Sequence, residues 1–152
     1  MAPNSTRLTR CLDSKLDEIR ILKKKTKNVE KAIILFNNSR ITETIKFLIN
    51  VGVISSNTKE IKNEHELGDT PAFEFANFLY ETIGLDKNKI GEFLGRNKPF
   101  NLLVLDHFFG NFNFQNMAID TAMRRAFKQI RLPKEFQEIE RIIYALATVF
   151  FK

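Results

Sequence analysis

The sequence predicts an all-α domain, an array of about seven helices joined by short loops. In several segments, apolar residues recur at the i, i+3, i+4 and i+7 spacing of an amphipathic helix. Only 6 glycines and 4 prolines occur among 152 residues, which favours long helices over many turns. No segment alternates with period two for long enough to predict a strand. A hydrophobic content of 43% and a charged content of 28% are ordinary for one globular domain.

The first fifty residues predict two helices. We expect residues 1–12 to be disordered, and a helix to run from about Leu12 into the thirties with a break near Lys25–Asn28. A second helix is expected over Ile41–Val51. Gly52 follows it directly, and a glycine in the left-handed region is a common way to end a helix.

The middle of the chain predicts a loop and three helices. Residues 55–68 are polar and predict the loop. Thr70 is a candidate N-cap residue, and Pro71 then occupies the first helical position, where a missing N–H costs nothing. Two short helices are expected at about Lys87–Leu94 and Pro99–Phe109.

A short elbow at residues 131–134 separates the last two helical patterns. Pro133 cannot continue a helix, because it lacks an N–H and its ring clashes with the preceding turn, and it biases Leu132 away from helical angles. Glu135 then stands where the second helix begins. The apolar stripe before the elbow contains Ile119, Ala122, Met123, Ala126, Phe127 and Ile130, and the stripe after it contains Phe136, Ile139, Ile142, Ile143, Leu146, Val149 and Phe150.

The pattern alone leaves two interpretations of Glu135 open. An acid in the first turn of a helix commonly complements the helix dipole and stabilises it by roughly 0.3–1 kcal/mol. A carboxylate held on a rigid elbow can also project outward and act on another molecule.

The elbow resembles the first signature of the Sec-seven family, exchange domains that act on ADP-ribosylation-factor GTPases. That signature runs Phe-Arg-Leu-Pro-Gly-Glu-Ala-Gln-Lys-Ile-Asp-Arg. Ile130 and Glu140 are conservative replacements. The positions that match it are Arg131, Leu132, Pro133, Glu135, Gln137, Ile139 and Arg141.

Blocks upstream of the elbow resemble the same family in the same order. They are Gly84–Lys87, Ile90–Gly95, Phe114, Ala122–Arg124 and, more loosely, Phe36-Asn37. The resemblance divides the chain into an extension over residues 1–27, disordered or helical, and a partial domain over 28–152 that resembles the N-terminal part of the exchange domain.

The resemblance implies a guanine-nucleotide exchange factor for ADP-ribosylation-factor GTPases that regulates vesicle trafficking. Such a protein would be cytoplasmic and peripheral at Golgi or endosomal membranes, and it needs no cofactor or metal of its own. Glu135 would be the catalytic glutamate finger that expels GDP and magnesium. The GTPase-binding residues would be Arg131, Leu132, Pro133, Lys134, Phe136, Gln137, Ile139, Glu140 and Arg141.

Three departures from the signature favour an alternative function. Lys134 replaces the family's glycine and places a cation beside the finger, where a positive φ would make lysine costly. Phe136 replaces a small alanine, and Glu138 replaces a lysine. The alternative is a non-catalytic helical module, or divergent fragment, that binds a GTPase or scaffold without exchange.

The C-terminal end predicts a domain truncated within a helix pattern. Nothing in the chain matches the family's second signature, an apolar helix that follows this region. We therefore expect part of the stripe over residues 139–150 to be uncovered, which predicts self-association through this helix and little exchange by the isolated chain.

The net charge of +6 allows an acidic partner or an anionic membrane. The basic residues are dispersed except for Lys23, Lys24, Lys25 and Lys27, which predict a solvated face or a weak membrane contact. No zinc spacing or RNA-binding aromatic motif accompanies them, so nucleic-acid binding is not expected.

Other chemistry finds little support in the sequence. Cys11 is the single cysteine, so no internal disulfide is expected. His107 is expected to be structural or at the surface rather than a ligand or base. No Gly-x-x-x-x-Gly-Lys-(Ser/Thr) loop is present, and Gly91 and Gly95 predict tight turns and a cap rather than a phosphate cradle.

Overall fold

The computed structural model describes residues 3–56 and 61–152, and this part of the chain contains seven α-helices, one short 3₁₀ helix and no strand. The all-α prediction is therefore confirmed. The helices are α1 (Pro3–Asn37), α2 (Ile41–Asn50), α3 (Asp69–Glu81), α4 (Lys87–Gly95), α5 (Pro99–Gly110), α6 (Ile119–Ala126) and α7 (Phe136–Phe150), with the 3₁₀ helix at Glu64–Glu66.

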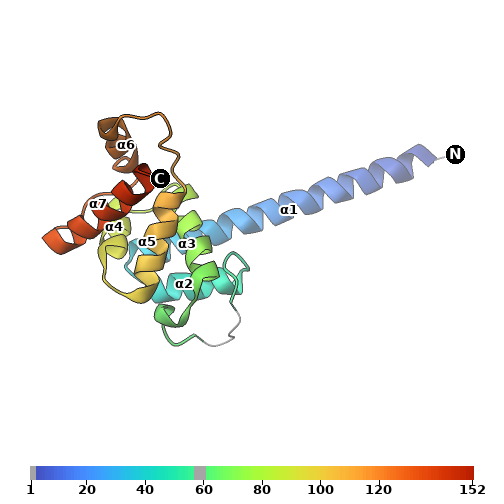
Figure 1. Cartoon of the computed structure of the whole chain (residues 1–152). Helices are drawn as coiled ribbons and strands as arrows, with labels where there is room; N and C mark the ends of the chain where they lie inside the picture. The colour runs from blue at the N-terminus through green and yellow to red at the C-terminus, as the bar shows by residue number, and fades with distance from the viewer. Residues whose placement is uncertain (1–2, 57–60) are drawn as a thin grey trace.

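The helices form a compact body from which most of α1 projects as a single rod (Figure 1). Within the body, α3 packs against α5, and α7 contacts α4, α5 and α6. The helices α6 and α7 lie on the side of the body away from the projecting end of α1. None of the helices described combines the length and apolar character that a membrane span requires.

Phenylalanine fills the core of the body. The ring of Phe75 on α3 lies at the centre, with its centroid 5.4 Å from that of Phe93 and 6.2 Å from that of Phe100. Phe36, near the end of α1, contacts the same ring at 6.4 Å. All four side chains are at most 2% exposed. Each such ring buries on the order of 150–250 Å², so this cluster fixes α1, α3, α4 and α5 relative to one another.

The end of α2 confirms the prediction for Gly52. This residue adopts φ +82°, and its N–H donates to the carbonyl of Ile49 at 3.1 Å. The N–H of Val53 donates to the carbonyl of Leu48 at 2.9 Å. These two bonds form a Schellman motif, which satisfies carbonyl groups that the end of a helix leaves unpaired.

The prediction that residues 1–12 are disordered is wrong from Pro3 onward, because α1 begins there and runs unbroken to Asn37. A proline at the first helical position loses no hydrogen bond, and no glycine or second proline follows within α1. The expected break near Lys25–Asn28 is also absent. Thr26 instead donates its hydroxyl to the carbonyl of Leu22 at 3.0 Å, a bond within the helix.

The helix α3 begins two residues earlier than predicted from Thr70 as N-cap and Pro71 as first helical residue. Gly68 is the N-cap residue and Asp69 the first helical residue, so Pro71 occupies the third position, still within the first turn, where N–H groups have no intrahelical partner. The carboxylate of Asp69 lies 2.7 Å from Nε2 of His107 on α5. This contact ties the start of α3 to α5 and confirms the prediction of a structural or surface histidine.

Asn37 joins the end of α1 to the loop that precedes α4. Its side-chain amide donates to the carbonyl of Gly84 at 3.0 Å, and its side-chain oxygen accepts from the N–H of Asp86 at 2.7 Å. Asp86 in turn caps α4 by accepting from the N–H of Asn88 at 2.9 Å. One carboxamide therefore positions the N-terminal end of α4.

The expectation that part of the stripe on α7 is uncovered is confirmed at Ile143, which is 38% exposed, but not at the centre of the stripe. Ile142 and Leu146 are at most 2% exposed, because α4, α5 and α6 cover the inward face of α7. The large apolar side chains of this region that remain most exposed are Phe136 at 77%, Tyr144 at 75% and Phe151 at 80%. Self-association through this helix stays a prediction.

Candidate functional site

The elbow of residues 131–134, with Ile130 before it and Glu135 after it, lies in the segment that connects α6 to α7. The helix α6 ends at Ala126, although the apolar stripe before the elbow predicted that it continues to Ile130. The chain leaves helical geometry there and carries Ile130, which is 1% exposed, into the core. Pro133 is also buried, whereas Leu132 is 38% exposed and Glu135 is exposed. The elbow therefore alternates inward anchors with outward side chains.

The elbow backbone lies directly against α4 at a glycine. A Cβ on Gly91 would lie 1.7 Å from the carbonyl oxygen of Arg131, so a larger residue does not fit at this position without movement. The N–H of Arg131 donates to the carbonyl of Lys87, one helical turn earlier, at 3.1 Å. Glycine is the residue that permits such close backbone approach.

Gly95, a second glycine of α4, packs against Pro133 of the elbow and Glu138 of α7. A Cβ on Gly95 would lie 2.8 Å from Cβ of Glu138 and 3.2 Å from the ring of Pro133. The guanidinium of Arg141 donates to the carbonyl of Gly95 and so caps the end of α4. The interpretation of Gly91 and Gly95 as residues of tight turns and a cap is therefore wrong, because both create space in α4 for the elbow and α7.

Glu135 is the N-cap residue of α7, with φ −81° and ψ 132°. Its carboxylate makes no capping hydrogen bond, and it has no hydrogen-bond or ion-pair partner elsewhere in the described part of the chain. N-cap residues are usually Ser, Thr, Asp or Asn, whose shorter side chains reach the free N–H groups. The fold thus uses the backbone of Glu135 and leaves its carboxylate available to another molecule.

Lys134 does not introduce the strain that the sequence suggested. The non-glycine residues with positive φ in the described chain are Ser39 and Asn116, so Lys134 has ordinary backbone angles. No ion pair joins Lys134 to Glu135 in this structure. The lysine is exposed beside the carboxylate without neutralising it through direct contact.

The predicted site residues lie together on the elbow and the first turns of α7. Some of them are exposed to solvent, and others are buried or half-buried against the body. The exposed members are Arg131, Leu132, Lys134, Glu135, Phe136, Gln137 and Glu140. Pro133 is buried, and Ile139 and Arg141 are half-buried. Sequence reasoning missed Gly91, Gly95 and Lys87 as the residues that hold the elbow, although the Gly-x-x-x-Gly spacing on one face of a helix was visible.

The four lysines of the predicted membrane contact, Lys23, Lys24, Lys25 and Lys27, are exposed on α1. Lys25 lines a hollow with Leu48 and Gly52 of the body, so this part of α1 lies where the rod meets the body. Figure 1 shows the rod leaving the body on the side away from α6 and α7. Among the residues that the structure describes, no three His, Cys, Asp or Glu side chains are grouped so as to hold a metal ion.

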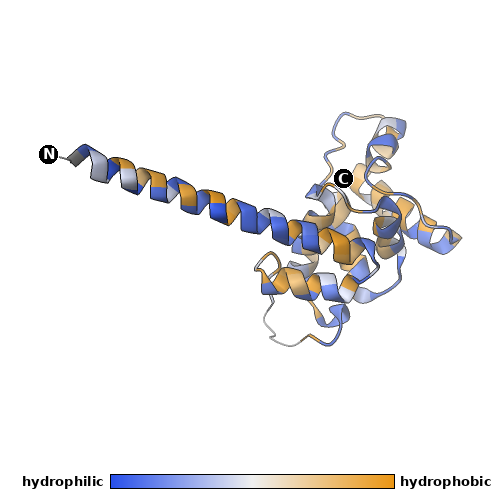
Figure 2. Cartoon of the chain, turned by 180° about the vertical axis from the view of Figure 1, so that it is seen from behind, coloured by the Kyte–Doolittle hydropathy of each residue, from blue (hydrophilic) through white to orange (hydrophobic). Residues whose placement is uncertain are grey.

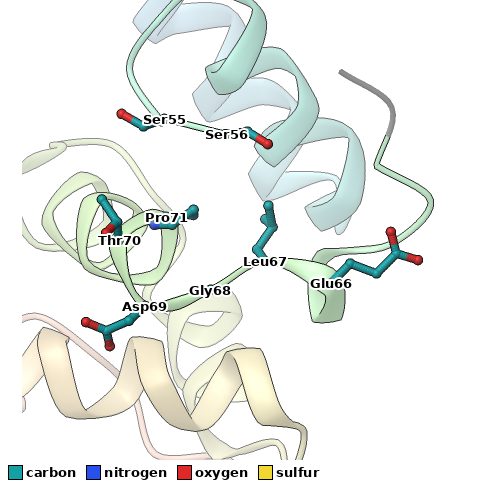
Figure 3. A pocket seen from close by; sticks show the side chains of 8 residues that line it. All are labelled: Ser55, Ser56, Glu66, Leu67, Gly68, Asp69, Thr70 and Pro71. Carbon is teal, nitrogen blue, oxygen red and sulfur yellow. The ribbon is translucent and has the colours of Figure 1, made fainter. Parts of the chain in front are cut away.

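A cavity of about 310 Å³ lies between the end of α2 and the start of α3. Ser55 and Ser56 line one side, and Leu67 and Pro71 lie across from them (Figure 3). The carboxylates of Glu66 and Asp69 point away from the hollow. This cavity contains no elbow residue and presents no cluster of reactive groups.

Comparison with known proteins identifies the family. The family model described as the Sec7 domain matches residues 25–152. The chain belongs to the Sec7 domain family. This is the Sec-seven family that the elbow and the upstream blocks resemble, so the recognition made from the sequence is confirmed.

Relatives and solved structures agree with this membership. The Sec7 chain is 34% identical over 124 residues to brefeldin A-inhibited guanine nucleotide-exchange protein 2 of Arabidopsis thaliana, covering 82% of this chain and 6% of the relative. It is 30% identical to the Sec7p catalytic domain, with a TM-score of 0.66, covering 80% of this chain and 59% of that one. A Sec7 domain solved with ARF1-GDP and brefeldin A is 27% identical, with a TM-score of 0.67, covering 86% and 59%. The chain thus spans a small part of this curated relative and about three fifths of both solved chains.

Proposed function

We propose that this Sec7 chain is a guanine-nucleotide exchange factor for ADP-ribosylation-factor GTPases and that Glu135 is its glutamate finger. The observation that carries the proposal is an exposed carboxylate that has no partner among the described residues. It follows an elbow that packs closely against α4 at Gly91 and Gly95. Support for the partner comes from the related Sec7 domain solved with ARF1-GDP.

The physical basis of the activity is charge repulsion. A GTPase holds GDP through Mg²⁺ and through cationic and backbone groups at the phosphates. A carboxylate brought close repels the phosphates and competes for the cations that hold them. Two unit charges about 4 Å apart interact by roughly 4 kcal/mol at the effective dielectric of a protein surface, which is enough to accelerate nucleotide release by orders of magnitude. Because the elbow is rigid, binding of the GTPase to the surrounding surface also holds this charge close to the nucleotide.

The surface around the finger suits a protein partner. Leu132, Phe136, Ile143 and Tyr144 expose apolar area on the elbow and on α7. We assign contact with the GTPase to the exposed residues Arg131, Leu132, Lys134, Phe136, Gln137 and Glu140. Pro133, Ile139 and Arg141 face the body at least in part, so we assign them the placement of the finger rather than direct contact.

The cellular setting follows from the same proposal. An exchange factor for these GTPases would act in vesicle trafficking, in the cytoplasm and peripherally at Golgi or endosomal membranes. The lysines of α1 could add a weak contact with anionic lipid, because each clustered lysine near such a surface contributes about 1 kcal/mol.

The second candidate is a module that binds the GTPase without releasing its nucleotide. One observation favours it. Phe136, which is 77% exposed, replaces a small residue of the family signature directly beside the finger. Both candidates use the same surface, so binding alone does not distinguish them.

The test measures GDP release and binding on the same GTPase. The chain should accelerate release of a fluorescent GDP analogue from a purified ADP-ribosylation-factor GTPase, and Glu135→Lys should nearly abolish this with unchanged helical dichroism. Glu81→Lys, an exposed charge reversal at the end of α3, is the matched control and should keep full activity. Binding without acceleration would favour the module, and an unchanged rate in Glu135→Lys would exclude the finger.

A further inference from the structure

The last residue of α1 is bonded to the loop that leads into α4. The side chain of Asn37 donates to the carbonyl of Gly84 at 3.0 Å and accepts from the N–H of Asp86 at 2.7 Å. Ala32 and Phe36 are fully buried, and Figure 2 shows α1 entering the body through this hydrophobic end. Asn37 is therefore attached to a part of α1 that the core fixes, and it can hold the loop in place.

The loop held by Asn37 continues directly into the carbonyl that binds the elbow. Asp86 is the N-cap residue of α4, and Lys87 is the first helical residue. The carbonyl of Lys87 accepts from the N–H of Arg131 at 3.1 Å, and Glu135 follows Arg131 along the elbow. The side chain of Asn37 is thus connected to the elbow through its bond to Asp86, the peptide between Asp86 and Lys87, and the bond to Arg131.

Apolar packing holds the middle of α4 more firmly than its first turn. Ile90 and Phe93 are at most 3% exposed, and Leu85 is buried in the loop before the helix. Lys87, by contrast, is exposed. Apolar burial is non-directional, whereas a hydrogen bond fixes one donor relative to one acceptor. The direction of the Lys87 carbonyl therefore depends on the bonds that Asn37 makes to the loop.

A carboxamide suits this position because it offers a donor and an acceptor at once. Gly84 adopts φ +101°, and a Cβ there would lie 3.7 Å from Cδ1 of Ile33, so the turn lies against α1. In this arrangement the carbonyl of Gly84 and the N–H of Asp86 both bind the one side chain of Asn37. Alanine at this position would supply neither group.

We propose that Asn37 is a positioning residue for Glu135. The two bonds of its carboxamide fix the first turn of α4, the first turn fixes the elbow at Arg131, and the elbow carries the finger. The inference rests on the proposed function, because it assigns to Asn37 an effect on nucleotide release. Asn37 belongs to α1 rather than to the elbow or α7, so this effect is transmitted through α4.

The first measurement follows the elbow itself and needs no GTPase. Hydrogen exchange at the amide of Arg131 reports its bond to Lys87, and the amide of Leu105, inside α5, reports opening of the whole body. Asn37→Ala should accelerate hydrogen exchange at Arg131 about tenfold relative to Leu105. Asn38→Ala is the matched control: this neighbouring asparagine is exposed and its side chain makes no hydrogen bond to the described residues, so neither amide should change.

The second measurement is GDP release from the GTPase at increasing concentrations of the chain. Asn37→Ala should lower the maximal rate about tenfold and change the half-saturating concentration less than about threefold, because the finger is displaced while the contact residues remain. A purely structural role would give the opposite pattern: fewer folded molecules raise the half-saturating concentration and leave the maximal rate unchanged. Asn38→Ala should match the parent chain in both quantities.

Changes at Asp86 test the same connection from the donor side and leave Asn37 in place. Asp86→Pro removes the N–H that Asn37 accepts, and the φ of −67° at Asp86 suits proline. Asp86→Ala is its reference, because it loses the same capping carboxylate but keeps the N–H. Hydrogen exchange at Arg131 should be faster in the proline variant than in the alanine variant.

The outcomes separate this inference from the proposed function. Equal hydrogen exchange in the two Asp86 variants, or equal acceleration at Arg131 and Leu105 in Asn37→Ala, would refute the connection. Faster hydrogen exchange at Arg131 together with an unchanged maximal rate of GDP release would refute the positioning role. A parent chain that releases no GDP would refute the proposed function instead, and hydrogen exchange would still decide whether Asn37 holds the elbow.

Discussion

The close approach of the elbow to α4 predicts that Gly91→Ala destabilises the domain. The added Cβ would lie 1.7 Å from the carbonyl oxygen of Arg131, whereas real Cβ contacts essentially never fall below 3.0 Å. The elbow or the helix must therefore shift by more than about 1 Å, a lower bound from these two distances. Such a shift also strains the bond from the Arg131 N–H to the carbonyl of Lys87.

The magnitude follows from three terms. Overpacking of a well-packed site costs about 1–3 kcal/mol. Loss of the Arg131–Lys87 hydrogen bond costs about 0.5–1.5 kcal/mol. Alanine regains about 1 kcal/mol of helix propensity over glycine inside α4. The expected net loss is about 0.5–3.5 kcal/mol in the free energy of unfolding.

The assay is urea unfolding followed by far-ultraviolet circular dichroism. Gly110→Ala is the matched control, because a Cβ there meets nothing within 4 Å and the residue has no left-handed φ. It should be as stable as the parent chain or slightly more stable. If Gly91→Ala matches Gly110→Ala, the elbow does not lie against α4 as described. Nucleotide exchange provides a second measurement, because a displaced elbow should also misplace Glu135.

Two further predictions concern the end of α4 and the residue beside the finger. Asn101→Ala should lower the free energy of unfolding by about 1–3 kcal/mol, because this 2% exposed amide donates to the carbonyl of Phe93 at 2.7 Å. Urea midpoints should show the loss, exposed Asn97→Ala should not, and equal midpoints would contradict the role of the bond. Lys134→Gly should keep or raise exchange, because it removes a cation beside Glu135. If GDP release instead stops while helical dichroism is unchanged, the lysine contacts the GTPase itself.

Helical content and the place of the elbow could be predicted from the sequence because their causes are local. A stripe of apolar residues at helical spacing needs only one covered face, and Pro133 interrupts a helix whatever surrounds it. Gly52 ends α2 through bonds to residues three to five positions before it. The position of Glu135 at the start of α7 follows from the same local signals.

The predictions of two helix ends were wrong, because contacts with residues distant in the sequence determine where these helices begin or end. The stripe of α6 continues to Ile130, but the helix ends at Ala126 because the following residues reach across to α4. The start of α3 moved to Asp69, whose carboxylate contacts His107, 38 residues later in the chain. Local helix propensity carries no information about these distant contacts, so both boundaries were predicted incorrectly from the sequence.

By itself, the sequence determined a helical Sec7 chain with an ionisable carboxylate at the start of its last helix. Only the tertiary structure decided that this carboxylate has no partner within residues 3–56 and 61–152, that Gly91 and Gly95 make room for the elbow, and that Arg141 caps α4. It also decided that the residues before Leu12 continue α1 as a projecting rod. The physical reason is that periodicity and turn chemistry act between near neighbours in sequence. Close backbone approach, burial and the availability of a charge depend on segments that only folding brings together.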